Sequence, residues 1–484
     1  MRSKLLKLVS SVVVVAGLLL VCGGLAVTWQ KHRQETSTLP DEQKIARTLE
    51  IIRTSIPANH KVLKVLFYGQ SITRSGWHNA VVAHWREKYP NTVFVVENRA
   101  LGGFASQYLI RTVERDVTTF YPDLIIFHAY GDHRAYEQIL RVFRSQTAAD
   151  VILQTDHGEI MPDPPCAEGL QLSLHRAPGC GGILWVHQKL WGDEMSYHKI
   201  PAFAKKYEMA MEPQRGWWRD YLLANKVDPH SLTRDGLHPN TSGNALMAQL
   251  FNRYFDNLVE RWNGQTEHNV SSLAAGGKDA GASQTLSFDG NRIELISDHP
   301  VTALPTVTID GQSPRQIDGC YQVTRTSPLN SVPDWPALRL ITLLHDQTVQ
   351  DWTATITHIS PDQASFDYTV KASATGDEGS GDSSHPFLSK SGHQKIEPDD
   401  WMVKRGYELK PVPLQVPAEV HWSVQFACGN EPEIIDRSNG ITEYRYVLGT
   451  GLANTRHTVQ LSSPAGTSSG SFELREYKPA LQVN

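Results

Sequence analysis

Lys64-Val65-Leu66-Phe67-Tyr68-Gly69-Gln70-Ser71-Ile72-Thr73 is the stretch that decides the fold of this chain. Its apolar run predicts a buried strand that stops at Gly69. Ser71 follows two residues later, before a segment with the pattern of a helix. Because glycine lets the backbone turn sharply, we expect the Ser71 hydroxyl at the carboxyl end of the strand, where open α/β sheets build their sites.

A serine hydroxyl is a weak nucleophile unless a base, an orienter for that base and donors for an oxyanion surround it. The segment Asp235-Gly236-Leu237-His238 supplies the first two. We expect His238 to take the proton from Ser71, and Asp235 to hold the imidazole in the required tautomer. Base and orienter lie on one short loop, so one backbone geometry places both.

Strands and helices alternate outward from this stretch. Further strands are expected over residues 92–97, 123–130, 151–155 and 209–212, with helices over 77–89, 106–120, 134–148, 201–207, 217–225 and 239–262. This alternation predicts an α/β fold with a doubly wound, parallel, five-stranded sheet. A segment from His157 to His198, rich in Pro, Gly and Cys, interrupts the alternation and is expected to be a functional loop insertion.

Length and composition set the outer limits of the prediction. With 484 residues the chain is too long for one ordinary core, so two domains are expected. Hydrophobic residues make up 40% and charged residues 20%, as in globular proteins. The net charge of −5 and the absence of a basic run argue against a nucleic-acid partner.

The amino terminus predicts a membrane partner. Arg2, Lys4 and Lys7 precede an apolar run from Leu8 to about Val27, which is near the length that crosses a bilayer. Residues 1–28 are therefore expected to be an uncleaved signal-anchor, with a cleaved signal peptide as the alternative. Either way, the bulk of the chain is expected outside the cytoplasm.

The remaining domain boundaries follow from shifts in composition. We expect a stalk and first helix over 29–60, the α/β domain over 61–263, and a linker over 264–284 that is rich in Gly, Ala and Ser. Residues 285–484 carry short β-branched or aromatic runs between turn residues. They predict an all-β, jelly-roll-like sandwich.

Four cysteines follow the amino-terminal run. An even count in an exported chain favours disulfides, with three possible pairings, although four free buried thiols are the alternative. The pairing Cys166–Cys180 and Cys320–Cys428 keeps each bond inside one expected domain.

Three segments resemble the sequence blocks of the SGNH (GDSL-type) hydrolases. Gly69 to Thr73 resembles the first block, with Gln70 where Asp is usual. Asn98 to Gly103 resembles the second block, and Asp235 to Pro239 resembles the last. The order Ser, Asp, His along the chain also fits this family. The resemblance implies a serine esterase, and family members with an added β domain are often carbohydrate esterases.

The resemblance also implies an oxyanion hole, which departs from the family pattern at one position. The backbone amides of Ser71 and Gly103 are expected to bind the oxyanion. Asp132 falls where the family carries asparagine, and a carboxylate cannot donate a hydrogen bond unless it is protonated. Three hypotheses stay open: Asp132 is protonated, His133 donates instead, or the two backbone amides suffice.

Together these features predict an extracytoplasmic serine esterase, in a bacterial periplasm or at the cell surface. It is expected to remove short acyl groups, such as acetyl, from an acylated carbohydrate through an acyl-Ser71 intermediate, without a cofactor or metal. Trp185 and Trp191 of the insertion are candidates for stacking on sugar rings, although tryptophan is more often a core residue.

Two rival functions remain. The first is a glycan O-acyltransferase that uses the same triad, with a sugar hydroxyl in place of water. The second is a catalytically silent surface protein that only binds glycan. The acyltransferase should depend on an acyl donor, whereas the binder should hold glycan without turnover.

Overall fold

The computed structural model describes residues 39–158, 192–264, 269–273, 283–301, 304–329, 332–429, 431–462 and 472–481. Several predicted features therefore lie outside the described residues. They are the segment 1–28, residues 29–38 of the expected stalk, residues 159–191 of the expected insertion, Trp185, Trp191 and the pair Cys166–Cys180. Within the part of the chain that is described, no helix is both long and apolar enough to cross a membrane.

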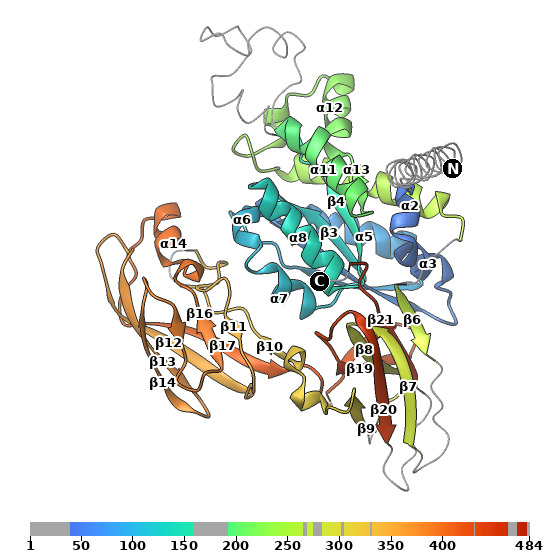
Figure 1. The fold of residues 1–484 in the computed structure, drawn as a ribbon. Helices are drawn as coiled ribbons and strands as arrows, with labels where there is room; N and C mark the ends of the chain where they lie inside the picture. Colours follow the sequence, from blue (N-terminus) through green and yellow to red (C-terminus); the bar gives the residue numbers. More distant parts are fainter. Residues whose placement is uncertain are drawn as a thin grey trace, which may run out of the picture. The chain divides into compact units, whose positions relative to one another are not determined.

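A five-stranded parallel sheet forms the centre of the α/β unit (Figure 1). Its strands are β1 (Lys61–Gly69), β2 (Thr92–Asn98), β3 (Leu124–His128), β4 (Asp150–Gln154) and β5 (Ala210–Glu212), in the order β2-β1-β3-β4-β5. The predicted doubly wound sheet is confirmed. The order reverses between β1 and β3, and ligand sites of such sheets lie at the carboxyl ends of the strands next to that reversal.

Helices cover both faces of the sheet. Successive side chains of β1 point to opposite faces, so they pack in two different cores. Phe67 packs in one core and Tyr68 in the other. The first core takes residues from α3 (Ala46–Thr54), α5 (Trp77–Lys88), α12 (Gln214–Asn225) and α13 (Thr241–Arg261). The second core takes residues from α6 (Ser106–Leu109), α7 (Val113–Thr118), α8 (His133–Gln146) and α11 (Ile200–Lys206).

Two helical predictions differ from the structure. The single helix expected over 106–120 is divided into α6 and α7. Between them the Thr112 hydroxyl donates to the Leu109 carbonyl, and such a bond competes with the helical backbone pattern. The short helix α2 (Asp41–Lys44) and α3 precede the expected start of the domain at residue 61, yet α3 buries Leu49 in the core of the α/β unit.

The carboxyl-terminal part is built mainly of β-strands, but it contains two β units instead of the one predicted, and it also contains a short α-helix. The proximal β unit has β6 (Val270–Leu273), β7 (Ser283–Gly290), β8 (Arg292–Ser297), β9 (Thr306–Ile309), β18 (Glu433–Asp436), β19 (Thr442–Gly449), β20 (Thr455–Ser462) and β21 (Glu473–Tyr477). Its strands form the sheets β18-β19-β8-β21-β6 and β7-β20-β9, which share one core.

The inserted β unit lies in the chain between β9 and β18. It has β10 (Tyr321–Val323), β11 (Thr342–Leu343), β12 (Gln350–Ile359), β13 (Phe366–Ala372), β14 (Gly376–Asp382), β15 (Phe387–Leu388), β16 (Gln394–Ile396), β17 (Ala418–Phe426) and helix α14 (Val403–Leu409). The sheets β10-β17-β12-β13-β14 and β11-β16-β15 share a core of their own.

The expected linker and one expected disulfide can be placed relative to the two β units. Part of the segment 264–284 is not a linker, because β6 pairs with β21 inside the proximal β unit. Cys320 and Cys428 form the disulfide that the sequence predicted. These residues stand just before β10 and just after β17, so the bond joins the two ends of the inserted β unit.

Candidate active site

Ser71 lies where β1 passes into the short helix α4 (Ser71–Arg74). Gly69 ends the strand with φ of +150°, and a Cβ atom there would stand 1.9 Å from the backbone oxygen of His128 on β3. Only glycine fits this close approach. The sharp exit from the sheet therefore leaves Ser71 at the carboxyl end of β1, as the sequence predicted.

The structure brings Ser71, His238 and Asp235 together in one hydrogen-bonded chain. The Nε2 atom of His238 lies 2.9 Å from Ser71 Oγ, and its Nδ1 atom lies 2.7 Å from Asp235 Oδ2. With Nδ1–H donating to the carboxylate, Nε2 presents a lone pair to the serine hydroxyl. This is the protonation state in which an imidazole can act as a base on serine.

The loop from Asp235 to His238 is held by its own carboxylate. Asp235 Oδ1 accepts the backbone N–H of His238 at 2.7 Å and that of Leu237 at 3.1 Å. The backbone N–H of His238, followed by the His238 imidazole, lowers the pKa of Asp235 to about 2. The carboxylate therefore stays ionised at neutral pH and favours the charged imidazolium that forms during proton transfer.

The second-block segment approaches Ser71 closely. A Cβ atom at Gly102 would stand 3.8 Å from Ser71 Cβ. Gly103 adopts φ of +80°, in the left-handed region that favours glycine. The segment that contains Gly103 thus approaches the serine, in the part of the chain where the resemblance places an oxyanion donor.

Hydrogen bonds fix this segment to the strand and helix that carry Ser71. The backbone N–H of Leu101 donates to the Gly69 carbonyl at 3.0 Å. The Asn98 side-chain amide donates to the Thr73 carbonyl of α4, also at 3.0 Å. The nucleophile and the second block therefore share one local framework.

The third-block residues occupy the start of α8. Asp132 is the N-cap of this helix, and its Oδ1 accepts the Ala135 backbone N–H at 2.8 Å. This contact accounts for a carboxylate at Asp132 without any role in oxyanion binding. His133 is the first residue of the helix. Gln70, which replaces the usual Asp of the first block, donates to the Tyr130 carbonyl at 2.8 Å.

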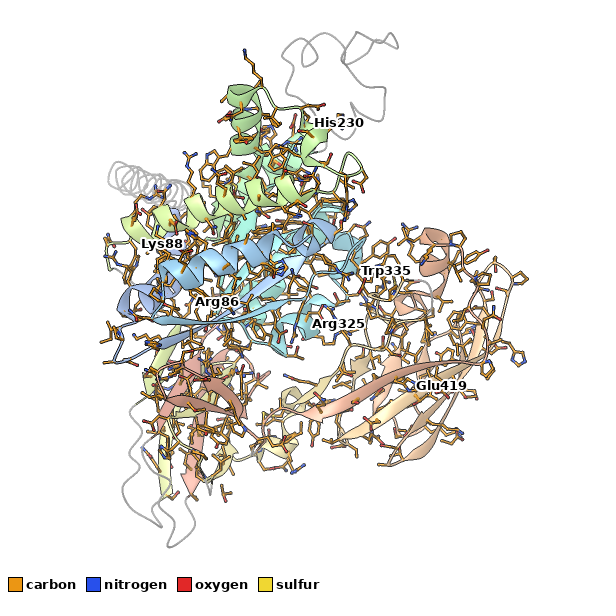
Figure 2. The ribbon with its side chains drawn as sticks, turned by 180° about the vertical axis from the view of Figure 1, so that it is seen from behind. Arg86, Lys88, His230, Arg325, Trp335 and Glu419 are labelled. Carbon is orange, nitrogen blue, oxygen red and sulfur yellow. A yellow bond between two sulfur atoms is a disulfide. The ribbon has the colours of Figure 1, made fainter. Side chains whose placement is uncertain are left out.

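Two side chains of the inserted β unit reach the second-block segment, and sequence analysis missed both. Trp335 Nε1–H donates to the Gly102 carbonyl at 2.6 Å, and its ring packs edge-on against Phe104 at 5.0 Å. Arg325 Nη2–H donates to the Arg99 carbonyl at 2.8 Å. Figure 2 labels both Trp335 and Arg325, which lie where the inserted β unit meets the α/β unit.

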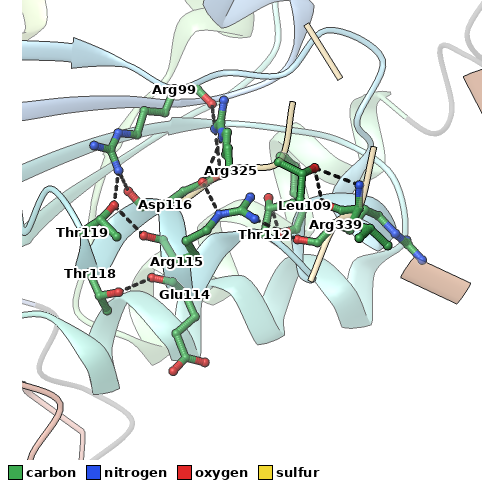
Figure 3. A network of polar contacts seen from close by, with 12 residues as sticks. Arg99, Leu109, Thr112, Glu114, Arg115, Asp116, Thr118, Thr119, Arg325 and Arg339 are labelled. Carbon is green, nitrogen blue, oxygen red and sulfur yellow. Dashed lines mark hydrogen bonds and ion pairs between the residues drawn. The ribbon is translucent and has the colours of Figure 1, made fainter. Parts of the chain in front are cut away.

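Arg325 is anchored by a buried carboxylate, shown with its neighbours in Figure 3. The Nε and Nη2 atoms of Arg325 lie 3.0 and 2.8 Å from the two carboxylate oxygens of Asp116. Burial would raise the pKa of Asp116, but Arg115 and Arg325 hold it below its ordinary value. Such bidentate pairs fix geometry as well as charge, so Arg325 joins the inserted β unit to the site.

Comparisons with known proteins give only distant similarities. No protein-family model matches the chain, and no curated protein matches it. A solved two-domain esterase described as active on acetylated mannans is 13% identical, covers 91% of this chain and 96% of its own, and has a TM-score of 0.33. A solved acetylxylan esterase from Geobacillus stearothermophilus is 16% identical, covers 41% of this chain and 94% of its own, and has a TM-score of 0.31. Similarity this low assigns no activity.

Proposed function

We propose that this chain is a serine ester hydrolase with Ser71 as nucleophile, His238 as general base and acid, and Asp235 as the orienting carboxylate. The observation that carries the proposal is the unbroken hydrogen-bonded chain from Ser71 through His238 to Asp235. It stands at the carboxyl edge of the sheet, beside a glycine-containing segment that can supply a backbone donor.

The chemistry follows from these positions in two halves. As Ser71 Oγ bonds to the ester carbonyl carbon, His238 Nε2 takes the hydroxyl proton, and the amides of Ser71 and Gly103 receive the negative oxygen. His238 then returns that proton to the departing alcohol as its C–O bond breaks. Water repeats the sequence on the acyl-Ser71 intermediate and releases the carboxylic acid.

The proposed substrate is a short acyl ester, such as acetyl, on a carbohydrate outside the cytoplasm. Sequence features support this choice. The basic residues and apolar run at the amino terminus favour export, and Trp185 and Trp191 are aromatic side chains suited to sugar rings. Either water or a sugar hydroxyl can accept the acyl group from acyl-Ser71, so the test measures acyl transfer to sugar alongside hydrolysis.

Comparing acyl chains and acceptors tests this substrate class. We expect the full chain to cleave aryl acetate far better than aryl octanoate and to release acetate from acetylated xylan. The Ser71→Ala variant should lose both activities. Trp185→Ala should harm polymer cleavage more than aryl ester cleavage. Preference for octanoate would reject the carbohydrate deacetylase. Acetyl transfer to added sugar faster than to water would favour the acyltransferase.

A further inference from the structure

A second histidine contacts the backbone of the catalytic loop next to His238. His157 follows β4, and its Nε2 atom lies 2.9 Å from the backbone oxygen of Leu237, the residue before His238. Its Nδ1 atom lies 3.0 Å from Asp156 Oδ1. The side chain of His157 is 0% exposed and that of Asp156 is 14% exposed, so both groups are shielded from solvent.

The partners of His157 determine its protonation. A carbonyl oxygen only accepts, so Nε2 must carry a hydrogen. The Asp156 carboxylate oxygen that faces Nδ1 also faces Nε2 of His128 at 3.2 Å, so it acts as an acceptor for the rings around it. Nδ1 must then carry a hydrogen too. A neutral imidazole would turn one lone pair toward an acceptor, whereas the imidazolium satisfies both contacts.

Two further groups contact the pair formed by Asp156 and His157. His128 places Nε2 at 3.2 Å from the same Asp156 oxygen, while its Nδ1 has no hydrogen-bond partner among the described residues. The nearby Arg215 donates to the His157 carbonyl at 3.0 Å and is paired with Asp193 at 2.8 Å.

We propose that the buried Asp156–His157 ion pair positions the catalytic loop. The imidazolium holds the Leu237 carbonyl, and this contact sets the separation between His238 Nε2 and Ser71 Oγ. His157 touches no reacting atom, so it is a positioning residue that acts through His238. The expected effect on kcat rests on the proposed esterase function, whereas the contacts of His157 with Asp156 and Leu237 do not.

Paired substitutions separate the two contacts of His157. In His157→Asn, the short amide can replace Nδ1 toward Asp156 but does not reach Leu237. In His157→Gln, the longer amide can replace Nε2 toward Leu237. His128→Asn is the matched control, since it removes a buried partner of Asp156 that does not contact the loop.

The kinetic prediction follows from these contacts. We expect His157→Asn to lower kcat on aryl acetate by about 10- to 100-fold, with KM nearly unchanged, because a misplaced base impairs only the chemical step. His157→Gln should recover part of that loss, and His128→Asn should keep the wild-type kcat despite a comparable fall in Tm. Equal kcat values for wild type and folded His157→Asn would overturn the proposal, as would equal losses in His157→Asn and His128→Asn.

A readout independent of turnover is the NMR spectrum of the full chain with ¹⁵N-labelled histidine. We expect both ring nitrogens of His157 to carry hydrogens at neutral pH, with signals assigned by their loss in His157→Gln. A single ring N–H would refute the ion pair. A wild-type chain that shows both signals but cleaves no ester would support the ion pair and refute the proposed function.

Discussion

Ser71 and His238 react directly in the proposed chemistry, whereas Asp235 only orients His238. Single substitutions should therefore lower activity to different extents. Ser71→Ala and His238→Ala should abolish turnover of aryl acetate, because each removes a reacting group. Asp235→Asn should lower kcat by about 10⁴-fold, since an amide facing Nδ1 permits the wrong imidazole tautomer. Initial rates on folded variants, checked by circular dichroism, test this order. Wild-type-like turnover by Asp235→Asn would contradict the orienting role.

The lowered pKa of Asp235 also predicts how pH changes stability. Its folded pKa of about 2 lies below the ordinary value of about 4, so the charged form is favoured by folding. The stabilisation is present above about pH 4 and is lost as pH falls toward 2. The Tm difference between wild type and Asp235→Asn should therefore shrink over this interval. A difference that stays constant with pH would contradict the assignment.

The triad could be predicted from the sequence because its signals are local. Ser71 stands two residues after the end of an apolar strand, and Asp235 and His238 are three residues apart on one loop. Trp335 had no such signal, since its hydrogen bond to Gly102 spans 233 residues. His157 was named only as the first residue of the expected insertion, because its contact with Leu237 joins residues that are 80 positions apart in the sequence.

At the scale of single elements, the start of α8 gives a prediction for the third block. Asp132 caps this helix, and asparagine is an equally good cap. We expect Asp132→Asn to keep the stability and activity of wild type, whereas Asp132→Ala should cost about 1 kcal/mol of unfolding free energy. Urea denaturation and aryl acetate rates measure both effects. A marked gain in activity for Asp132→Asn would show that the carboxylate charge opposes the oxyanion.

Buried apolar elements were predictable, and short polar ones were not. The parallel sheet followed from its apolar runs, since its strands are covered on both faces. β6 was not predicted, because Val270–Leu273 is only four residues long and contains two serines. It also lies inside a segment that has the composition of a linker. The turn between α6 and α7, where the Thr112 hydroxyl donates to the Leu109 carbonyl, leaves no mark in the sequence periodicity.

For the whole molecule, the structure changes the role expected of the carboxyl-terminal part. Sequence analysis names no site residue in it other than the two cysteines, yet its inserted β unit donates hydrogen bonds to the second-block segment through Trp335 and Arg325. A chain that ends near Trp262 should therefore lose activity on small esters. Full activity of such a folded chain would show that these contacts are dispensable.

A point variant tests the same coupling without removing a domain. Trp335→Phe keeps a ring against Phe104 but loses the donor to Gly102, so kcat on aryl acetate should fall by about tenfold. Trp401→Phe is the control, since this tryptophan is also buried in the inserted β unit. Equal kcat values in the two variants would contradict a specific contribution from Trp335.

Covalent labelling tests the central claim most directly. A fluorophosphonate reacts with a serine only where a base and an oxyanion site activate it, so the modified peptide identifies the nucleophile. In the full chain at neutral pH, we predict a single labelled residue, Ser71, with no labelling in Ser71→Ala and little in His238→Ala. Labelling of a different serine, or of none in a folded wild-type chain, would contradict the account.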